Sequence, residues 1–133
     1  MALELVTTEE AAAHLRCDED TEDTWLSVFI PAISEAVALW LKDEWRLYLP
    51  SYDSSGDVVV DSSGDPISAL DEDGVGTPRP VVRAAVLVEL ASQFRFRDGE
   101  GTENVVTPDA GYGYMLNKAS TNLLAALRKS TLA

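Results

Sequence analysis

Apolar residues recur at helical spacing along two long stretches of the chain, and each stretch predicts a core helix. The first runs from about residue 20 to 42, and its apolar stripe consists of Leu26, Phe29, Ile30, Ile33, Val37, Trp40 and Leu41. Pro31 lies inside it, so we expect a kink or a late start, because proline removes one helical hydrogen bond. The second follows Pro78 and Pro80, and its predicted buried face consists of Val81, Ala84, Ala85, Val88, Ala91 and Phe94. Further apolar residues make this helix apolar nearly all round, which predicts the central helix of the core.

Two shorter helices are predicted near the ends of the chain. Thr7 and Glu10 have the spacing of a capping box, in which a hydroxyl and a carboxylate satisfy free backbone N–H groups, and this helix ends near Cys17. The last helix covers about 115–129, with the stripe Leu116, Ser120, Leu123, Leu124 and Leu127. The predicted fold class is therefore mainly α, a small bundle of about four helices in a single domain over residues 1–133.

Residues 43–77 lose the helical periodicity and are rich in Asp, Ser and Gly. Two nearly identical turn sequences, Asp53-Ser54-Ser55-Gly56-Asp57 and Asp61-Ser62-Ser63-Gly64-Asp65, flank Val58-Val59-Val60. Residues 45–49 and 66–70 are possible partner strands, so we expect a short β-hairpin, meander or loop insertion that projects from the helical body. So few strands are marginal alone, and the insertion should lean on the body or on a neighbouring molecule. A further long loop is predicted over 98–114.

Few residues in this chain suggest catalysis or metal binding. The sequence has no Gly-x-Ser-x-Gly elbow, no Walker loop and no dinucleotide-binding glycine pattern. The acidic residues lie in solvated Gly/Ser turns, and reading frames from Asp61 and Asp71 do not fit a calcium-binding loop. His14 and Cys17 share one helix, but a helix-end histidine and a small buried thiol are the simpler interpretation. We therefore expect a protein that is not an enzyme, with no cofactor and no metal.

The chain shows neither a membrane span nor a secretory signal. No uninterrupted apolar run reaches the roughly 18 residues that crossing a bilayer requires. The first residues, Met1 to Leu5, have no basic start and no apolar core. We therefore expect a protein that does not associate with a membrane.

Negative charge is concentrated in the N-terminal part of the chain. The 133 residues include 10 Lys and Arg against 23 Asp and Glu, a formal net charge of −13. Residues 1–77 contribute −15 and residues 78–133 contribute +2. The acidic part should repel nucleic-acid phosphate, which argues against a protein that grips DNA but not against one that lets DNA slide past. Solubility alone is the simpler explanation of the charge.

Two sets of side chains are candidates for contact with another molecule. The first set consists of arginines on and after the second core helix: Arg79, Arg83, Arg95 and Arg97. They form either a solvated face or a contact with the acidic half of another subunit in a ring. The second set is aromatic: Trp25, Trp40, Trp45, Tyr48 and Tyr52. These side chains either pack in the core and against the insertion, or anchor an exposed interface.

Three segments of the chain together resemble the head-to-tail connector (adaptor) proteins of tailed phages, a family also described as DNA-packaging proteins. The first segment is Leu5-Val6-Thr7-x-x-Glu10-Ala11-x-x-His14-Leu15-Arg16, then the acidic stretch Asp18 to Asp23 and the helix ending in Trp40-Leu41-Lys42. The other two are the proline-led helix from Pro78 to Phe96 and the pattern Leu123-Leu124-x-x-Leu127-Arg128. The chain departs from the family at Ala12 or Ala13, where a basic or polar residue is usual, at Pro31, and over 43–77.

The resemblance implies a structural protein of the virion, assembled in the host cytoplasm. Such adaptors form a homo-oligomeric ring of about a dozen copies under the portal protein, in the neck between head and tail. The ring extends the channel through which DNA passes without specific binding, and it offers a surface to the next connector, stopper or tail protein. In the family a C-terminal arm docks on the portal. Here the arm is 127–133, and its candidate portal-binding residues are Leu127, Arg128, Lys129 and Leu132.

Two alternative functions fit the same composition. One is another virion component of similar build, such as a tail-completion or stopper protein. The other is a non-structural acidic module, for example a DNA mimic or an inhibitor of a nucleic-acid enzyme. A DNA mimic should array carboxylates at phosphate spacing on one face, whereas these carboxylates cluster in Gly/Ser turns.

Overall fold

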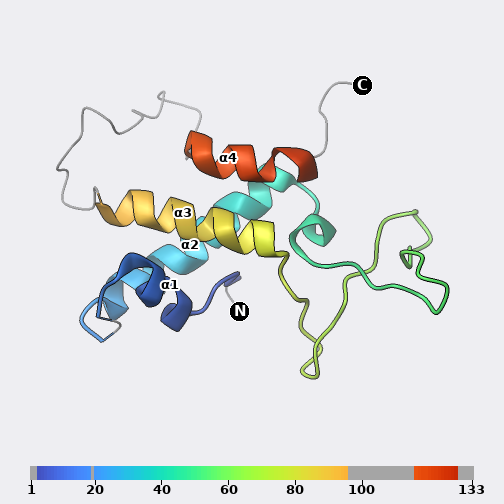
Figure 1. Cartoon of the computed structure of the whole chain (residues 1–133), viewed down its shortest axis with the longest axis horizontal. Coiled ribbons are helices and arrows are strands. Elements are labelled where there is room, and N and C mark those ends of the chain that lie inside the picture. Colours follow the sequence, from blue (N-terminus) through green and yellow to red (C-terminus); the bar gives the residue numbers. More distant parts are fainter. Residues whose placement is uncertain (1–2, 19, 96–115, 129–133) are drawn as a thin grey trace.

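Four helices pack together to form the body of the protein. The computed structural model describes residues 3–18, 20–95 and 116–128. The helices are α1 (Thr8–Leu15), α2 (Asp23–Leu41), α3 (Pro80–Arg95) and α4 (Lys118–Leu124), with short 3₁₀ turns η1 (Glu44–Leu47) and η3 (Ala125–Leu127). α3 contacts each of the other three helices, and it lies between α1 and α4 (Figure 1). The mainly α prediction is confirmed, and the described residues contain no β-sheet.

The first helix begins and ends where the sequence predicts. Thr7 is the N-cap residue, and its Oγ1 accepts the Glu10 backbone N–H at 3.0 Å. Arg16 ends α1 in the left-handed conformation, with φ 56°, and Cys17 donates its N–H to Ala12 at 3.1 Å. The capping box is formed in part only, because the Glu10 carboxylate turns toward Arg83 of α3.

The buried faces of α2 and α3 form the core. α2 contributes Leu26, Ile30, Ile33, Val37 and Leu41, each at most 2% exposed. The helix begins at Asp23, well before Pro31, so the late start is wrong. The buried face predicted for α3 is also wrong in register: the buried positions are Val82, Ala85, Val86, Glu89 and Leu90. Its near-uniform apolar surface does not specify a face, and packing against the other three helices selects one.

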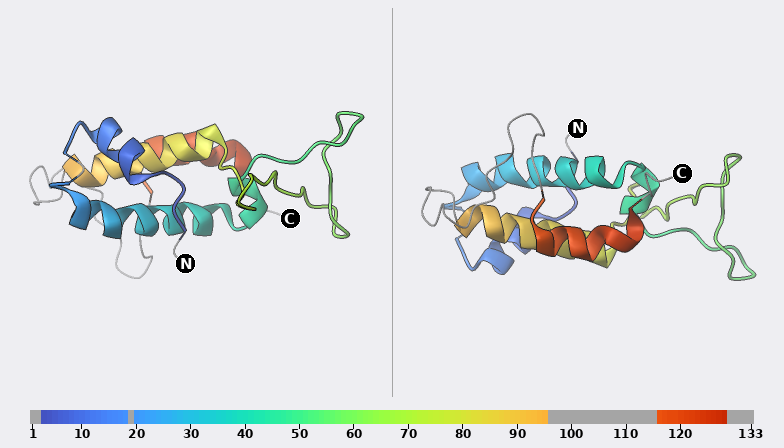
Figure 2. Two further views of the ribbon diagram at one scale, coloured as in Figure 1. Left: turned by 90° about the horizontal axis from the view of Figure 1, so that it is seen from below. Right: turned by 90° about the horizontal axis from the view of Figure 1, so that it is seen from above.

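A segment of extended chain projects from one end of the bundle. We call residues 48–78 the projection; Figure 1 shows it leaving the helices, and both views in Figure 2 agree. The two partner strands predicted at 45–49 and 66–70 do not form: Glu44–Leu47 is the 3₁₀ turn η1, and the described pairing consists of five isolated antiparallel bridges. Turns recur too often for longer ladders, and prolines that lack an N–H occupy three of the bridges.

The last helix is shorter than predicted. Asn117 caps α4 by accepting the Ser120 N–H at 2.9 Å, and the helix continues to Leu124 before it tightens into η3. The loop predicted over 98–114 lies outside the described residues.

Among the described helices, α2 is the one that is long and apolar enough to cross a membrane, judged by length and composition. The core helix of a soluble protein meets the same test, so this property is weak evidence for a membrane span. In this fold the inner side of α2 forms the core.

Candidate functional site

The projection contains three turns of the same construction. In each, an aspartate Oδ1 accepts two backbone N–H groups, from the second and fourth residues after it; the aspartates are Asp53, Asp61 and Asp71. The distances are 2.9 to 3.1 Å, and the glycine three residues after each aspartate has a φ of +76° to +85°. Two of these turns were predicted from their nearly identical sequences at 53–57 and 61–65. The third, beginning at Asp71, has the same Asp-x-x-Gly spacing but lacks the serines.

Two closed rings of backbone hydrogen bonds hold the three turns together. The outer ring consists of three bonds from a backbone N–H to a backbone carbonyl: Ser51 to Ile67 at 2.8 Å, Ile67 to Val59 at 2.9 Å, and Val59 to Ser51 at 2.9 Å. A second ring, nearer the body, joins Leu49, Ala69 and Thr77 in the same way, at 2.8 to 3.3 Å. Within each ring, every residue donates its backbone N–H to one of the other two and accepts an N–H from the third. Hydrogen bonds therefore connect the three turns, although no ladder is longer than one bridge.

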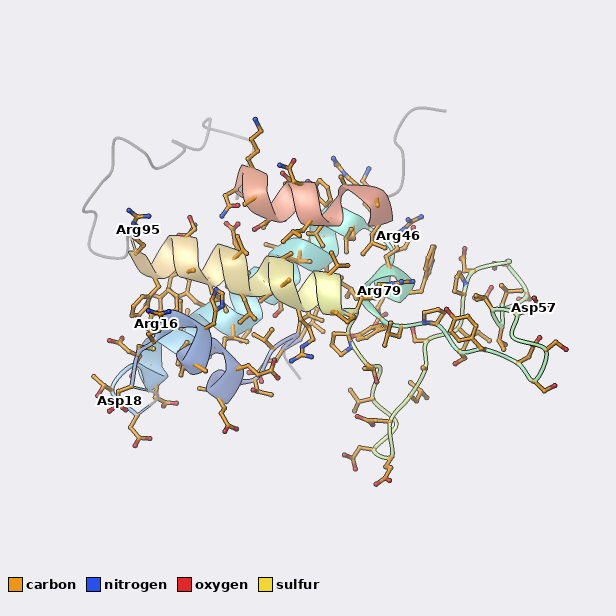
Figure 3. The ribbon with its side chains drawn as sticks, viewed as in Figure 1. Arg16, Asp18, Arg46, Asp57, Arg79 and Arg95 are labelled. Carbon is orange, nitrogen blue, oxygen red and sulfur yellow. The ribbon has the colours of Figure 1, made fainter. Side chains whose placement is uncertain are left out.

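The surface of the projection combines exposed apolar side chains with negative charge. Seven large apolar side chains are 37% to 65% exposed: Leu49, Tyr52, Val58, Val60, Ile67, Leu70 and Val75. The same 31 residues include seven acids and no base. Asp57 lies at the far end of the projection, as Figure 3 shows. Exposed apolar side chains in a well-defined segment are typical of a surface that contacts another protein.

The base of the projection is fixed to the helical body. Arg79, which precedes α3, donates its N–H to Leu47 at 2.8 Å. The Tyr48 ring lies so close to Gly76 that a Cβ atom there would be 2.7 Å from Tyr48 Cδ1. Burial, and then the nearby negative charge of Glu44, raise the pKa of Tyr48 above its ordinary value of 10.0. The base is therefore a packed joint between body and projection.

The four candidate inter-subunit arginines do not form one cluster. Arg83 pairs with Glu10 of α1 in the same chain. Arg79 and Arg95 lie at opposite ends of α3 (Figure 3), and the Arg79 Nε is buried without a hydrogen-bond partner among the described residues. Arg97 lies outside the described residues.

Two of the four candidate portal-binding residues pack on the body of their own chain. The Leu127 carbonyl accepts a hydrogen bond from the Arg46 guanidinium. The Arg128 guanidinium lies 4.4 Å from the centroid of the Trp40 ring, in a cation–π contact. Lys129 and Leu132 lie outside the described residues.

Sequence reasoning missed a buried acidic residue in the core. Glu89 of α3 is 1% exposed, and its Oε2 accepts the Ser120 hydroxyl at 2.8 Å and the Asn117 N–H at 3.0 Å. The Ser120 hydroxyl is also 3.3 Å from the Ala85 carbonyl. Glu89 thus binds the start of α4. The available signal was one acidic residue inside an apolar helix, which requires polar partners if it is buried.

Some of the candidate aromatic side chains pack within the body, and one is exposed as an interface residue would be. Trp25 stacks on Phe29 with ring centroids 4.4 Å apart, and it meets Phe94 edge-on at 5.1 Å. Trp45 contacts the Arg46 guanidinium, 4.4 Å from the ring centroid. Tyr52, in contrast, is 63% exposed on the projection. Packing therefore accounts for most of the set, and Tyr52 belongs to the exposed surface.

A groove lies where the N-terminal segment, the end of α2 and the base of the projection meet. Its volume is about 1060 Å³, and its lining includes Leu3, Leu39, Tyr48, Val75 and Arg83. No group of three His, Cys, Asp or Glu side chains in the described part of the chain could hold a metal ion. Charged residues, among them Glu4, Glu10, Lys42 and Asp71, also line the groove, so its walls are mixed in polarity.

The fold and these surfaces define a mainly α protein: four packed helices and a rigid, acidic projection with apolar side chains on its surface. Comparisons with models of protein families, with curated proteins and with solved structures found no match.

Proposed function

We propose that this protein is a structural component of a tailed-phage particle, an adaptor that forms a homo-oligomeric ring under the portal protein. The ring extends the DNA channel and presents a surface to the next connector, stopper or tail protein. The proposal rests on the resemblance of the N-terminal segment to head-to-tail connectors, together with the shape and surface of the folded chain.

The projection is the observation that carries this proposal. It extends from the bundle (Figures 1 and 2), and its seven large apolar side chains remain 37% to 65% exposed. A segment that hydrogen bonds hold in one conformation, but that leaves its apolar side chains exposed, gains free energy when a partner covers them. A structural subunit in an assembly is the class of protein for which such a segment has an evident use.

The N-terminal motif has a structural role that supports the resemblance. Leu5, Val6 and Ala11 are at most 3% exposed and belong to the core. The Leu5 N–H donates to the buried Ser34 hydroxyl of α2 at 3.0 Å, and Thr7 caps α1. The motif therefore specifies how α1 is attached to the body. Proteins with the same fold would need residues of this kind at the same positions.

The acidic charge agrees with a channel for DNA. A lumen lined by carboxylates repels phosphate, so DNA moves through it without binding. The groups of exposed acids lie in the projection and near the turn between α1 and α2, at opposite ends of the molecule; Asp57 and Asp18 mark these ends in Figure 3.

Quantitative mass spectrometry of purified virus particles tests the proposed function. About a dozen copies of this chain per particle, equal in number to the portal subunits, is the expected result for one ring. A few copies, or copies that stay with detached tails, would favour the tail-completion or stopper alternative. Absence from particles would contradict both virion functions and leave the acidic inhibitor as the leading hypothesis.

A further inference from the structure

Two exposed parts of the described chain carry opposite charge: the acidic projection, and the segment formed by α4 and η3, which has the basic residues Lys118 and Arg128 at its two ends. Resting on the proposed homo-oligomeric ring, we propose that the outer turns of the projection of one copy pack across the exposed face of α4 in the next copy. The partner is thus a second copy of this chain, and the contact joins two different surfaces.

The projection supplies negative charge that its own turns do not use. In each turn the first aspartate accepts the backbone N–H groups, whereas Asp57, Asp65 and Asp73 contribute their backbone N–H to those bonds. All three of these residues are exposed. The projection also exposes apolar side chains, of which Val60 is 51% and Leu70 65% exposed.

The face of α4 has the complementary properties. The segment 115–133 contains three basic residues and no acid. Within its described part, Lys118 and Arg128 are exposed at the two ends of the helical segment, and Leu123 between them is 37% exposed. Glu89, an acid that contacts α4, is buried beneath the helix and binds its first turn. The described part of this segment therefore has an exposed basic residue at each end and a partly exposed leucine between them.

The geometry of one chain keeps these two surfaces apart. The projection leaves the bundle beyond the end of α2, and its outer turns lie away from α4 in all three views (Figures 1 and 2). The two hydrogen-bonded rings hold the turns in place, so the projection does not fold back onto its own α4. Contact between the two surfaces is consequently a contact between copies. Because the two surfaces differ, repeated contacts generate a ring or a helical filament.

Charge reversal with rescue tests this contact. The projection variant is Asp57→Lys, Asp65→Lys and Asp73→Lys, which retains the three aspartates that build the turns. The face variant is Lys118→Glu with Arg128→Glu, and a third protein combines both sets. Sedimentation velocity at about 0.15 M salt measures self-association, and circular dichroism confirms folding. We expect each variant to weaken self-association at least about tenfold, and the combination to restore most of it, because opposite charges again face each other.

A matched control separates a specific contact from an effect of net charge. Glu4→Lys, Glu9→Lys and Asp20→Lys change the charge by the same amount as the projection variant, at exposed sites outside the projection. The control should self-associate like the wild type. Equal losses in the control and the projection variant, or no rescue in the combined protein, would overturn the proposal. A wild type that stays monomeric at high concentration would overturn it as well.

Cross-linking places the contact independently. In a Cys17→Ser background, a chain with Ser62→Cys on the projection is mixed with a chain carrying Asn122→Cys on α4, and a flexible bismaleimide is added. Covalent dimers should form in the mixture, and not when the second chain carries Thr24→Cys on α2 in place of Asn122→Cys. If wild-type protein self-associates but this pair gives no dimer, the interface lies elsewhere. Copy number in particles, which tests the proposed function, does not depend on this result.

Discussion

A buried carboxylate of α3 binds the start of α4. Glu89 accepts hydrogen bonds from the Asn117 backbone and the Ser120 hydroxyl, both at the start of α4. We expect Glu89→Ala to lower the free energy of unfolding by about 2 kcal/mol, because the Asn117 N–H loses its acceptor and the Ser120 hydroxyl keeps only the longer bond to the Ala85 carbonyl. Urea unfolding followed by circular dichroism measures this change. Glu35→Ala, at an exposed position of α2, is the matched control, and a similar loss there would contradict the assignment.

The ion pair between Arg83 and Glu10 joins α3 to α1 but should stabilise the protein only slightly. The Arg83 side chain is 43% exposed and the Glu10 side chain 33%, so water screens the attraction. A double-mutant cycle with Glu10→Gln and Arg83→Gln should give a coupling free energy below about 1 kcal/mol. A coupling of several kcal/mol would show that the pair is shielded from water. Arg83→Glu alone would place two carboxylates together, so its effect on an arginine contact between subunits cannot be separated from the loss of this pair.

At the scale of elements, the base of the projection depends on close contact between Tyr48 and Gly76. A Cβ atom at Gly76 would overlap the Tyr48 ring, so Gly76→Ala should displace the ring and destabilise this joint by about 1 to 3 kcal/mol. Hydrogen exchange of the Leu49 and Thr77 amides, which belong to the hydrogen-bonded ring nearer the body, should become faster. Val75→Ala, at a neighbouring position that is 57% exposed, should leave these exchange rates unchanged.

The same joint should make stability dependent on alkaline pH. Burial and the charge of Glu44 raise the pKa of Tyr48, so the folded protein favours the neutral phenol. This contribution to stability is complete below the unfolded pKa of 10.0 and is lost as the pH rises through the higher folded pKa. Unfolding of the wild type and of Tyr48→Phe, compared from pH 8 to 11, should show a smaller loss in the phenylalanine variant. Parallel curves would mean that Tyr48 does not contribute.

At the scale of the whole molecule, the proposed function predicts different roles for two parts of the C-terminal segment. Leu127 and Arg128 contact Arg46 and Trp40 of their own body. Removal of residues 129–133 should therefore abolish binding to the portal protein without changing the unfolding midpoint, as measured by pull-down and thermal unfolding. Removal of 127–133 should also lower the midpoint. Portal binding by the shorter truncation would contradict the role proposed for Lys129 and Leu132.

The residues that local rules govern were predictable from the sequence. Thr7 capped α1, the apolar stripe of α2 faced the core, and the Asp-x-x-Gly sequences formed turns. Prediction failed where the local signal was degenerate. α3 is apolar on nearly every side, so its sequence does not show which face is buried. Residues 45–49 have the composition of a strand, but Glu44–Leu47 forms a 3₁₀ turn.

The candidate surfaces were predictable in composition but not in arrangement. The helices, the turns and the uneven charge follow from the sequence, because they depend on residues that are neighbours along the chain. The contacts of Glu89 with α4, of Arg83 with Glu10 and of Arg46 with Leu127 follow only from folding, since these partners are 28 to 81 residues apart. Folding also joins the three turns in closed hydrogen-bonded rings, because such rings exist only when distant segments meet in space.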